Sequence, residues 1–470
     1  MTRVLSVASE CVPLIKTGGL ADVAGALPAA LAPHGVGMRT LLPGYRGVMA
    51  AQGTAAPVVA ELGDLFGGPA RIRRAALGET ALYLLDAPHL FDRDGGPYLG
   101  PDGKDWPDNP QRFAALDRAA AIIARDGIEG WRPQVLHLHD WQAGLAPVYL
   151  RQLGVRDVRT LLTIHNVAFQ GLAPAHMLGA LQLPAHLFTP QGFEYWGRIS
   201  ALKAGIVFAD KVSTVSPTYA EELMTPEFGM GMEGVLADRG ADFIGILNGI
   251  DLKTWTPPYS DTKGKARARA ALRAEFGLPE AAGPLCVVIS RLSEQKGLDL
   301  LIEALPALIE NGGQLAVLGA GDPALEAALR AAAERNPTGV ALRIGYDEAL
   351  AHRMIEGGDA ILVPSRFEPC GLTQMYGLRY GTLPVVSLTG GLADTVINAS
   401  AAAMGAGVAT GLQFHPVTAQ ALARTLERLV ALYRQPELWQ GMVANAMAQP
   451  VGWDASAKAY ADLFNSMTTA

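Results

Sequence analysis

Residues 286–305, CVVISRLSEQKGLDLLIEAL, carry the pattern that decides the fold. An apolar run comes first, a short polar stretch with a glycine follows, and the apolar residues then recur at helical spacing. A continuous apolar run is typical of a strand buried on both faces of a parallel sheet, and an amphipathic helix covers such a sheet. The stretch therefore predicts a strand, a loop and a helix in the order of an α/β fold.

The same pattern recurs along the 470-residue chain, where short runs rich in Val, Ile and Leu alternate with Ala-rich helical segments. In the first half the expected strands are 4–9, 39–43, 81–87, 135–140, 159–166 and 211–216. In the second half they are 286–291, 314–321, 340–345, 360–365 and 383–388. Because the chain is also too long for one ordinary core, we expect two α/β units, each with a parallel sheet under helices.

A polar stretch separates the two units. Residues 248–278 place a Pro-Pro pair between the strand-like FIGILNG and a basic helical segment, which predicts a boundary near residues 248–260. We expect one domain over 1–247, a second over 248–450 and a terminal helix over 451–470, which could pack back on the first domain.

Charge and cysteine content exclude several classes of partner. With 38 basic and 45 acidic residues the net charge is −7, which gives no long-range attraction for nucleic acid or an anionic membrane. An anionic ligand must then be held by local basic residues. The cysteines, Cys11, Cys286 and Cys370, show no disulfide or CxxC spacing and fit a cytoplasmic protein. Glu10 interrupts the apolar start, so we interpret this segment as a buried strand rather than a signal peptide.

The hexapeptide TGGLAD occurs twice, at residues 17–22 and 389–394, without similarity around it. The glycines can adopt positive φ and let a ligand approach the backbone closely, although an ordinary strand-to-helix turn would also use them. Lys16 precedes the first copy, so an ammonium and free backbone N–H groups predict a local anion site there. The loop lacks the residue order of a P-loop, and no dinucleotide fingerprint follows the first strand.

Two segments of the second unit combine charge with a helix start. Arg291 and Lys296 follow an expected strand, where open α/β sheets bind ligands, although two solvated surface cations are the alternative. Glu368 and Cys370 precede a further helix start within RFEPCGLTQMYG. The helix amides there could bind phosphate while Glu368 accepts hydroxyl hydrogen bonds, although Glu368 could instead be a surface cap.

Two strand ends of the first unit carry imidazole and amide groups. HLHDWQAGL contributes His137, His139 and Asp140, and TIHNVAFQG contributes His165 and Asn166. A metal would need a further ligand at a recognisable spacing, and none is evident. A row of His, Asn, Asp and Trp side chains suits a sugar better, since hydroxyls need donors and acceptors and sugar C–H faces favour aromatic rings.

Taken in order from residue 16 to 396, these segments resemble the ADP-glucose-using bacterial glycogen synthases and the plant starch synthases. The resemblance implies a GT-B fold, with two Rossmann-like domains facing each other across a deep cleft. It implies transfer of glucose from ADP-glucose to the nonreducing 4-hydroxyl of an α-1,4-glucan, glycogen or a maltooligosaccharide, with retention of configuration and release of ADP. No metal cofactor, nucleic acid or membrane partner is expected. Ala21, where starch synthases have glycine, favours the glycogen branch.

The resemblance also assigns roles to residues of this chain. It implies that catalysis involves Lys16, His165, Arg291, Lys296 and Glu368. It implies that nucleotide and phosphate are bound by Lys16, Gly18, Gly19, Arg291, Lys296, Gly371, Leu372 and Thr373, with Tyr346 stacked on adenine. It implies sugar contacts from Asp140, His165, Asn166, Asn248, Glu368 and Cys370. The cations would stabilise the leaving diphosphate.

Three other functions are compatible with parts of this pattern. A GT-B enzyme could use UDP-glucose or a small sugar acceptor, because donor choice depends on pocket contacts. A catalytically silent glucan-binding protein would not need the combined set of cations and Glu368. A Rossmann oxidoreductase would need the missing fingerprint.

Overall fold

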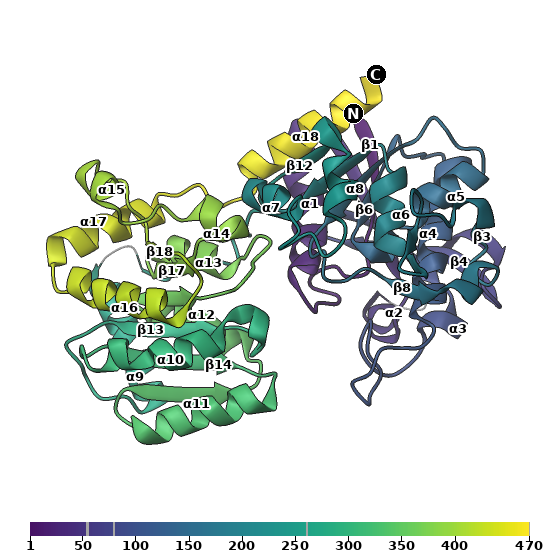
Figure 1. Cartoon of the computed structure of the whole chain (residues 1–470). Coiled ribbons are helices and arrows are strands. Elements are labelled where there is room, and N and C mark those ends of the chain that lie inside the picture. The colour runs from purple at the N-terminus through teal and green to yellow at the C-terminus, as the bar shows by residue number, and fades with distance from the viewer. Residues whose placement is uncertain (53–55, 79, 260–261, 470) are drawn as a thin grey trace. The chain divides into compact units, whose positions relative to one another are not determined.

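The computed structural model describes residues 1–52, 56–78, 80–259 and 262–469. They form two compact units: the first unit comprises Met1–Gly249 and Trp453–Ala470, and the second unit comprises Ile250–Gly452. Both are built on sheets with helices on their faces, so the predicted fold class is confirmed (Figure 1). Residue 260, where the expected linker ends, and Ala470, where the expected terminal helix ends, lie outside the described ranges.

The described part of the first unit contains a nine-stranded sheet in the order β12-β11-β7-β6-β1-β2-β5-β4-β3. Its strands are β1 (Thr2–Val7), β2 (Val36–Pro43), β3 (Val58–Asp64), β4 (Pro69–Leu77), β5 (Thr80–Asp86), β6 (Val135–His139), β7 (Arg159–Ile164), β11 (Lys211–Thr214) and β12 (Phe243–Gly245). All six strands expected in the first half are present, and they pair in parallel. The antiparallel strands β3 and β4 were not predicted, because their partly exposed residues give no continuous apolar run.

Helices and a small sheet complete the first unit. The sheet has the order β8-β10-β9, with β8 (Leu172–Pro174), β9 (Glu194–Tyr195) and β10 (Arg198–Ser200). The α-helices are α1 (Gly19–Leu31), α2 (Arg46–Gln52), α3 (Pro88–Phe91), α4 (Asn109–Asp126), α5 (Ala146–Gln152), α6 (Ala201–Phe208), α7 (Pro217–Leu223), α8 (Glu233–Ala237) and α18 (Asp454–Thr469).

The described part of the second unit contains a six-stranded parallel sheet in the order β15-β14-β13-β16-β17-β18. Its strands are β13 (Leu285–Ile289), β14 (Gln314–Gly319), β15 (Val340–Ile344), β16 (Ala360–Val363), β17 (Leu383–Ser387) and β18 (Leu412–Phe414). All five expected strands are present, and only the short β18 was not predicted. The α-helices are α9 (Thr262–Phe276), α10 (Leu298–Ile309), α11 (Pro323–Arg335), α12 (Glu348–Gly357), α13 (Thr373–Tyr380), α14 (Gly390–Thr395), α15 (Ala401–Gly405), α16 (Ala419–Tyr433) and α17 (Pro436–Met447).

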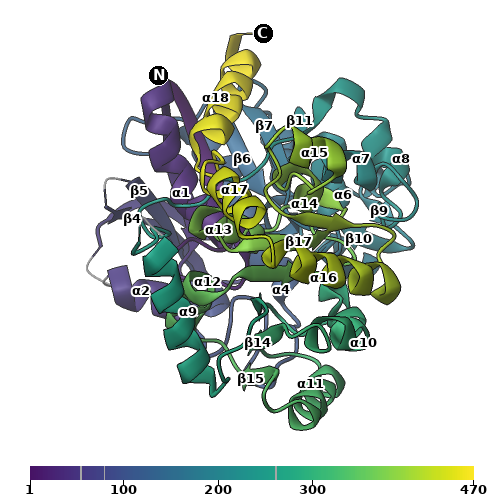
Figure 2. The ribbon, with the colours of Figure 1, turned by 90° about the vertical axis from the view of Figure 1, so that its left-hand side faces the viewer.

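The last helix of the chain belongs to the core of the first unit. Figures 1 and 2 show α18 running beside α1 and β1, which it also contacts. Tyr460 and Phe464 of α18 are fully buried in the cluster that contains Val4 and Leu27. Burying an aromatic or large aliphatic side chain contributes about 1.5–3 kcal/mol, so α18 is an integral part of this core.

Candidate functional sites in the two units

Parallel pairing brings the expected site residues of each unit to one sheet edge. In the first unit β7, β6 and β1 are neighbours, and the loops after them carry His165, Asp140 and Lys16. In the second unit β13 and β16 are neighbours, and the loops after them carry Lys296 and Glu368. The carboxyl edge of an open α/β sheet is where such folds bind ligands.

Glu10 organises the loop that carries Lys16, a role that the sequence analysis missed. Its carboxylate accepts hydrogen bonds from Thr17 Oγ1 at 2.6 Å, from the Gly18 amide at 3.3 Å, and from the Thr17 amide. The Tyr98 hydroxyl also donates to it, at 2.5 Å. An acidic residue shortly before glycine amides is a sequence signal for such a bond, whereas nothing in the local pattern points to Tyr98.

This arrangement corrects the expected anion site at the first TGGLAD copy. The Thr17 and Gly18 amides are not free, because they already bind the Glu10 carboxylate. Gly18 has extended backbone at φ −156° and does not use the positive φ that a glycine permits, and Gly19 begins α1. The Lys16 ammonium pairs with Asp22 at 2.8 Å, and both side chains are partly exposed. Such a pair contributes only about 0–1 kcal/mol, so Lys16 can exchange Asp22 for a phosphate at little cost.

Asp140 holds the segment that contains His165 and Asn166. Its Oδ1 accepts the amide of His165 at 2.6 Å and that of Asn166 at 3.4 Å, while its own amide donates to Thr163. Asp140 has a φ of +55°, an unfavourable conformation for a non-glycine residue, which is found preferentially at functional sites. Burial raises the pKa of Asp140 to about 7, although the two amides oppose this shift.

Burial also sets the charge state of the histidines at this sheet edge. It lowers the pKa values of His165 and His137 to about 3 and lowers the pKa of His139 as well. All three rings are therefore neutral near pH 7. A neutral imidazole has one donor and one acceptor, which suits a sugar hydroxyl.

Asn248 is 6% exposed, and its Oδ1 is buried without a hydrogen-bond partner among the described residues. An unsatisfied buried polar atom costs about 1–3 kcal/mol. A ligand hydroxyl would remove this cost, and Asn248 therefore stays a candidate sugar contact.

In the second unit a cation and a hydroxyl group contact one oxygen of Glu368. Glu368 Oε2 lies 2.5 Å from Lys296 Nζ and accepts from Ser365 Oγ at 2.8 Å. Glu368 is 7% exposed, so it is not the surface cap considered as its alternative. Its Oε1 has no hydrogen-bond partner within the described ranges and can accept one from a ligand.

The two loops that carry Lys296 and Glu368 are held together by an ion pair and a backbone hydrogen bond. Arg366 makes a bidentate ion pair with Asp299 at 2.7 and 2.6 Å, and its amide donates to the Gln295 carbonyl. Gly297, at φ +65°, lies so close to the Pro364 carbonyl that a Cβ would come within 2.0 Å. Arg291 is exposed on the first of these loops, and its guanidinium has no hydrogen-bond or ion-pair partner in the described part of the chain.

The N-terminus of α13 lacks a side-chain cap. Its N-cap residue is Leu372, which cannot accept a hydrogen bond from the amides, whereas Asp322 and Asp347 cap α11 and α12. Gly371, at φ +69°, directs the chain into Thr373 at the first turn. Uncapped helix amides favour an anion, which supports the expected phosphate contacts at 371–373.

The second TGGLAD copy has a different physical role from the first. Gly390, at φ +44°, and Gly391 pack against the backbone that follows Glu368, where a Cβ would come within 2.0 Å of the Glu368 carbonyl oxygen and 2.1 Å of the Cys370 carbonyl oxygen. The Gly391 amide donates to the Glu368 carbonyl at 3.1 Å. A Cβ on Gly18 would meet nothing within 4 Å. The second copy therefore shapes the Glu368 loop through close packing.

Two further expected contacts differ in exposure. Tyr346 is 79% exposed, so its ring is accessible for stacking on a base. Cys370 is 5% exposed, and its carbonyl accepts from the Gln374 side chain at 3.0 Å. A contact from Cys370 to a sugar stays a prediction.

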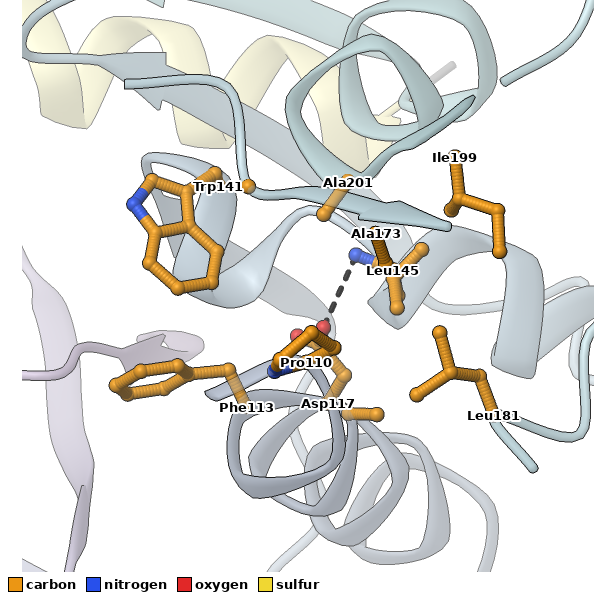
Figure 3. A pocket seen from close by; sticks show the side chains of 11 residues that line it. Pro110, Phe113, Asp117, Trp141, Leu145, Ala173, Leu181, Ile199 and Ala201 are labelled. Carbon is orange, nitrogen blue, oxygen red and sulfur yellow. Dashed lines mark hydrogen bonds between the residues drawn. The ribbon is translucent and has the colours of Figure 1, made fainter. Parts of the chain in front are cut away.

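A small cavity of the first unit lies between α4, the segment after β6 and the strands β8 and β10 (Figure 3). It is lined by Phe113, Asp117, Trp141 and apolar neighbours, and its volume of about 10 Å³ is too small for a sugar or a nucleotide. Trp141 packs edge-on against Phe113, with ring centroids 4.9 Å apart, and lies against Gly171. We had expected Trp141 to face a sugar, but its ring mainly packs against Phe113 and Gly171.

The described residues contain neither a cluster of metal ligands nor a helix that could span a membrane. In the described ranges no group of three or more His, Cys, Asp or Glu side chains could hold a metal ion. No helix among the residues described is long and apolar enough to cross a membrane.

Comparisons with known proteins identify the class. The starch synthase catalytic domain model matches residues 3–238, and the model of glycosyl transferases group 1 matches residues 272–446. The catalytic domain of starch synthase IV from Arabidopsis thaliana, solved with ADP and acarbose, is 30% identical with a TM-score of 0.89 and full coverage of both chains. Sucrose-phosphate synthase from Thermosynechococcus elongatus, 20% identical with a TM-score of 0.62 over both full chains, shares the fold. The fold and these matches define a glycosyltransferase of the GT-B class.

Curated relatives narrow the class to one family. The glycogen synthase of Paracoccus denitrificans is 79% identical over 99% of this chain and 100% of its own length. The glycogen synthase of Jannaschia sp. is 58% identical over 99% of both chains. The chain belongs to the glycogen and starch synthase family, which confirms the resemblance seen in the sequence.

Proposed function

We propose that the protein transfers glucose from ADP-glucose to the nonreducing 4-hydroxyl of an α-1,4-glucan, with retention of configuration and release of ADP. The observation that carries this proposal is the pairing of Lys296 with Glu368 beside the uncapped start of α13. A cation and helix amides suit a diphosphate, and a carboxylate oxygen suits glucose hydroxyls. The 79% identity to a glycogen synthase supports the same reaction.

Charge on the leaving group is the main electrostatic demand of this reaction. In our proposal Arg291 and Lys296 stabilise the diphosphate as it leaves, so the reaction needs no metal cofactor. Glu368 holds glucose hydroxyls through Oε1, because its Oε2 is engaged by Lys296 and Ser365. Lys16 binds phosphate through its ammonium, Gly18 and Gly19 allow the phosphate to approach this loop closely, and Tyr346 stacks on adenine. Asp140, His165, Asn166, Asn248 and Cys370 belong to the sugar side.

The decisive experiment is a donor and acceptor matrix with the purified full chain. We expect ADP release from ADP-glucose only when glycogen or a maltooligosaccharide is present, unchanged by EDTA, and little reaction with UDP-glucose. Equal use of both donors would favour the UDP-glucose alternative, and loss of activity in EDTA would contradict the metal-free proposal. We also place the protein in the cytoplasm, which the three free cysteines support. Fractionation of cells that express the tagged chain tests this location.

A further inference from the structure

A row of rings connects the last helix of the chain to His165. Tyr460 and Phe464 of α18 each lie 5.4 Å from His137, measured between ring centroids. His137 lies 4.2 Å from His139, and His139 lies 5.2 Å from His165. His137 and His139 are completely buried, whereas His165 is partly exposed. His165 is thus the member of this row that a ligand can reach.

Hydrogen bonds connect the inner part of the row to β1. His139 Nδ1 lies 2.9 Å from His165 Nε2, and His139 Nε2 lies 3.1 Å from Ser6 Oγ. A bond between two neutral imidazoles needs an N–H on one ring and a lone pair on the other. The tautomer of His139 therefore determines the tautomer of His165.

The surroundings of Ser6 favour one direction for this chain of bonds. Ser6 is fully buried, and in the described residues its hydroxyl bonds only to His139. If the hydroxyl accepted from His139, its own proton would be buried without an acceptor, which costs free energy. Ser6 therefore donates to His139 Nε2, and His139 Nδ1–H donates to His165 Nε2. The remaining nitrogen of His165, Nδ1, then carries a proton.

We infer that Ser6 and His139 are positioning residues that fix His165 as the Nδ1-protonated tautomer, so that it donates a hydrogen bond to a hydroxyl oxygen of the substrate. His165 Nδ1 has no hydrogen-bond partner among the described residues, so this N–H is available to a ligand. The substrate part of this inference rests on the proposed function. The tautomer part rests on the hydrogen-bond geometry and on the neutral state of the rings.

The tautomer is measurable without any activity assay. In the ¹⁵N-histidine-labelled full chain, we expect two-bond ¹H–¹⁵N correlations to show His165 protonated at Nδ1. Ser6→Ala removes the directing donor and should populate both tautomers of His165. His137→Phe keeps the ring contacts without touching His165 and serves as the control, with the His165 signals unchanged. An Nε2-protonated His165 in the parent protein would overturn the inference, as would signals that Ser6→Ala leaves unchanged.

Kinetics tests the functional part separately. His139→Leu removes the donor to His165 and should lower kcat by about 10-fold to 100-fold, with a much smaller change in KM for ADP-glucose. His139→Asn can place an amide N–H near the position of Nδ1 and should recover most of the activity. Equal losses in both variants with intact folding would contradict the positioning role. If the parent protein has no activity with ADP-glucose, the proposed function fails while the tautomer result stands.

Discussion

Lys296 Nζ lies 2.5 Å from Glu368 Oε2, although the two residues are 72 positions apart in the sequence. They meet because β13 and β16 are neighbours in the sheet and their following loops are bonded through Arg366. The pair is mostly buried, with 18% and 9% of the two side chains exposed. The energetic consequences of breaking it are therefore larger than for a surface ion pair.

Lys296→Ala should lower turnover by about 100-fold or more, because it removes a cation placed to stabilise the leaving diphosphate. Initial rates of ADP release measure this effect. Lys458→Ala is a matched control, since Lys458 forms an exposed ion pair with Asp462 at 2.6 Å on α18 and should leave turnover unchanged. Near-normal turnover of Lys296→Ala would contradict the assigned role.

Alanine substitutions in the two TGGLAD loops should have different effects on the stability of the protein. Gly391→Ala drives a Cβ into the Cys370 carbonyl and should destabilise the protein by about 1–3 kcal/mol through overpacking. Gly18→Ala has open space and extended backbone and should leave stability unchanged. Thermal unfolding of both variants checks this contrast. Equal melting temperatures would mean that the second loop relaxes without cost.

Glu10→Ala should lower kcat/KM for ADP-glucose by about 10-fold to 100-fold, because it releases the loop that positions Lys16. Lys16→Ala provides the second arm of a double-mutant cycle. If Glu10 acts through Lys16, the double variant should be no worse than Lys16→Ala within about threefold. Independent, multiplying losses would show that Glu10 has a separate role.

His137→Phe should reduce the acid sensitivity of the protein. The folded-state pKa of His137, about 3, lies below the unfolded value near 6.5, so only the unfolded chain binds this proton between those pH values. The stabilising effect of the neutral buried ring is complete above pH 6.5 and is lost as pH falls toward 3. We therefore expect the free energy of unfolding, measured with urea at pH 4–6, to fall less steeply with decreasing pH in the variant, by about 1.4 kcal/mol per pH unit. Parallel pH profiles would contradict this prediction.

The sequence was sufficient to predict most parallel strands and the positions of the polar residues that follow them. Apolar runs identified most of the parallel strands, though not β18, and the polar residues after them, such as Asp140 and Glu368, lie at the carboxyl edges as expected. Hydrogen bonds between side chains that lie far apart in the sequence were not predictable. Tyr98 reaches Glu10 across 88 positions, and the Ser6 hydroxyl meets His139 across 133, because tertiary pairing creates these contacts. The roles of the two TGGLAD loops were also not predictable, since the same six residues pack closely in the second loop and leave open space at Gly18 in the first.

The position of α18 also has consequences for synthesis of the chain. The second unit is continuous from Ile250 to Gly452, so all of its residues leave the ribosome before α18 does. The N-terminal part of the first unit is translated first but lacks Tyr460 and Phe464 until α18 emerges. Domains generally fold as units during synthesis, yet here the N-terminal one is completed last. A nascent chain halted before residue 453 would expose an apolar surface that chaperones bind.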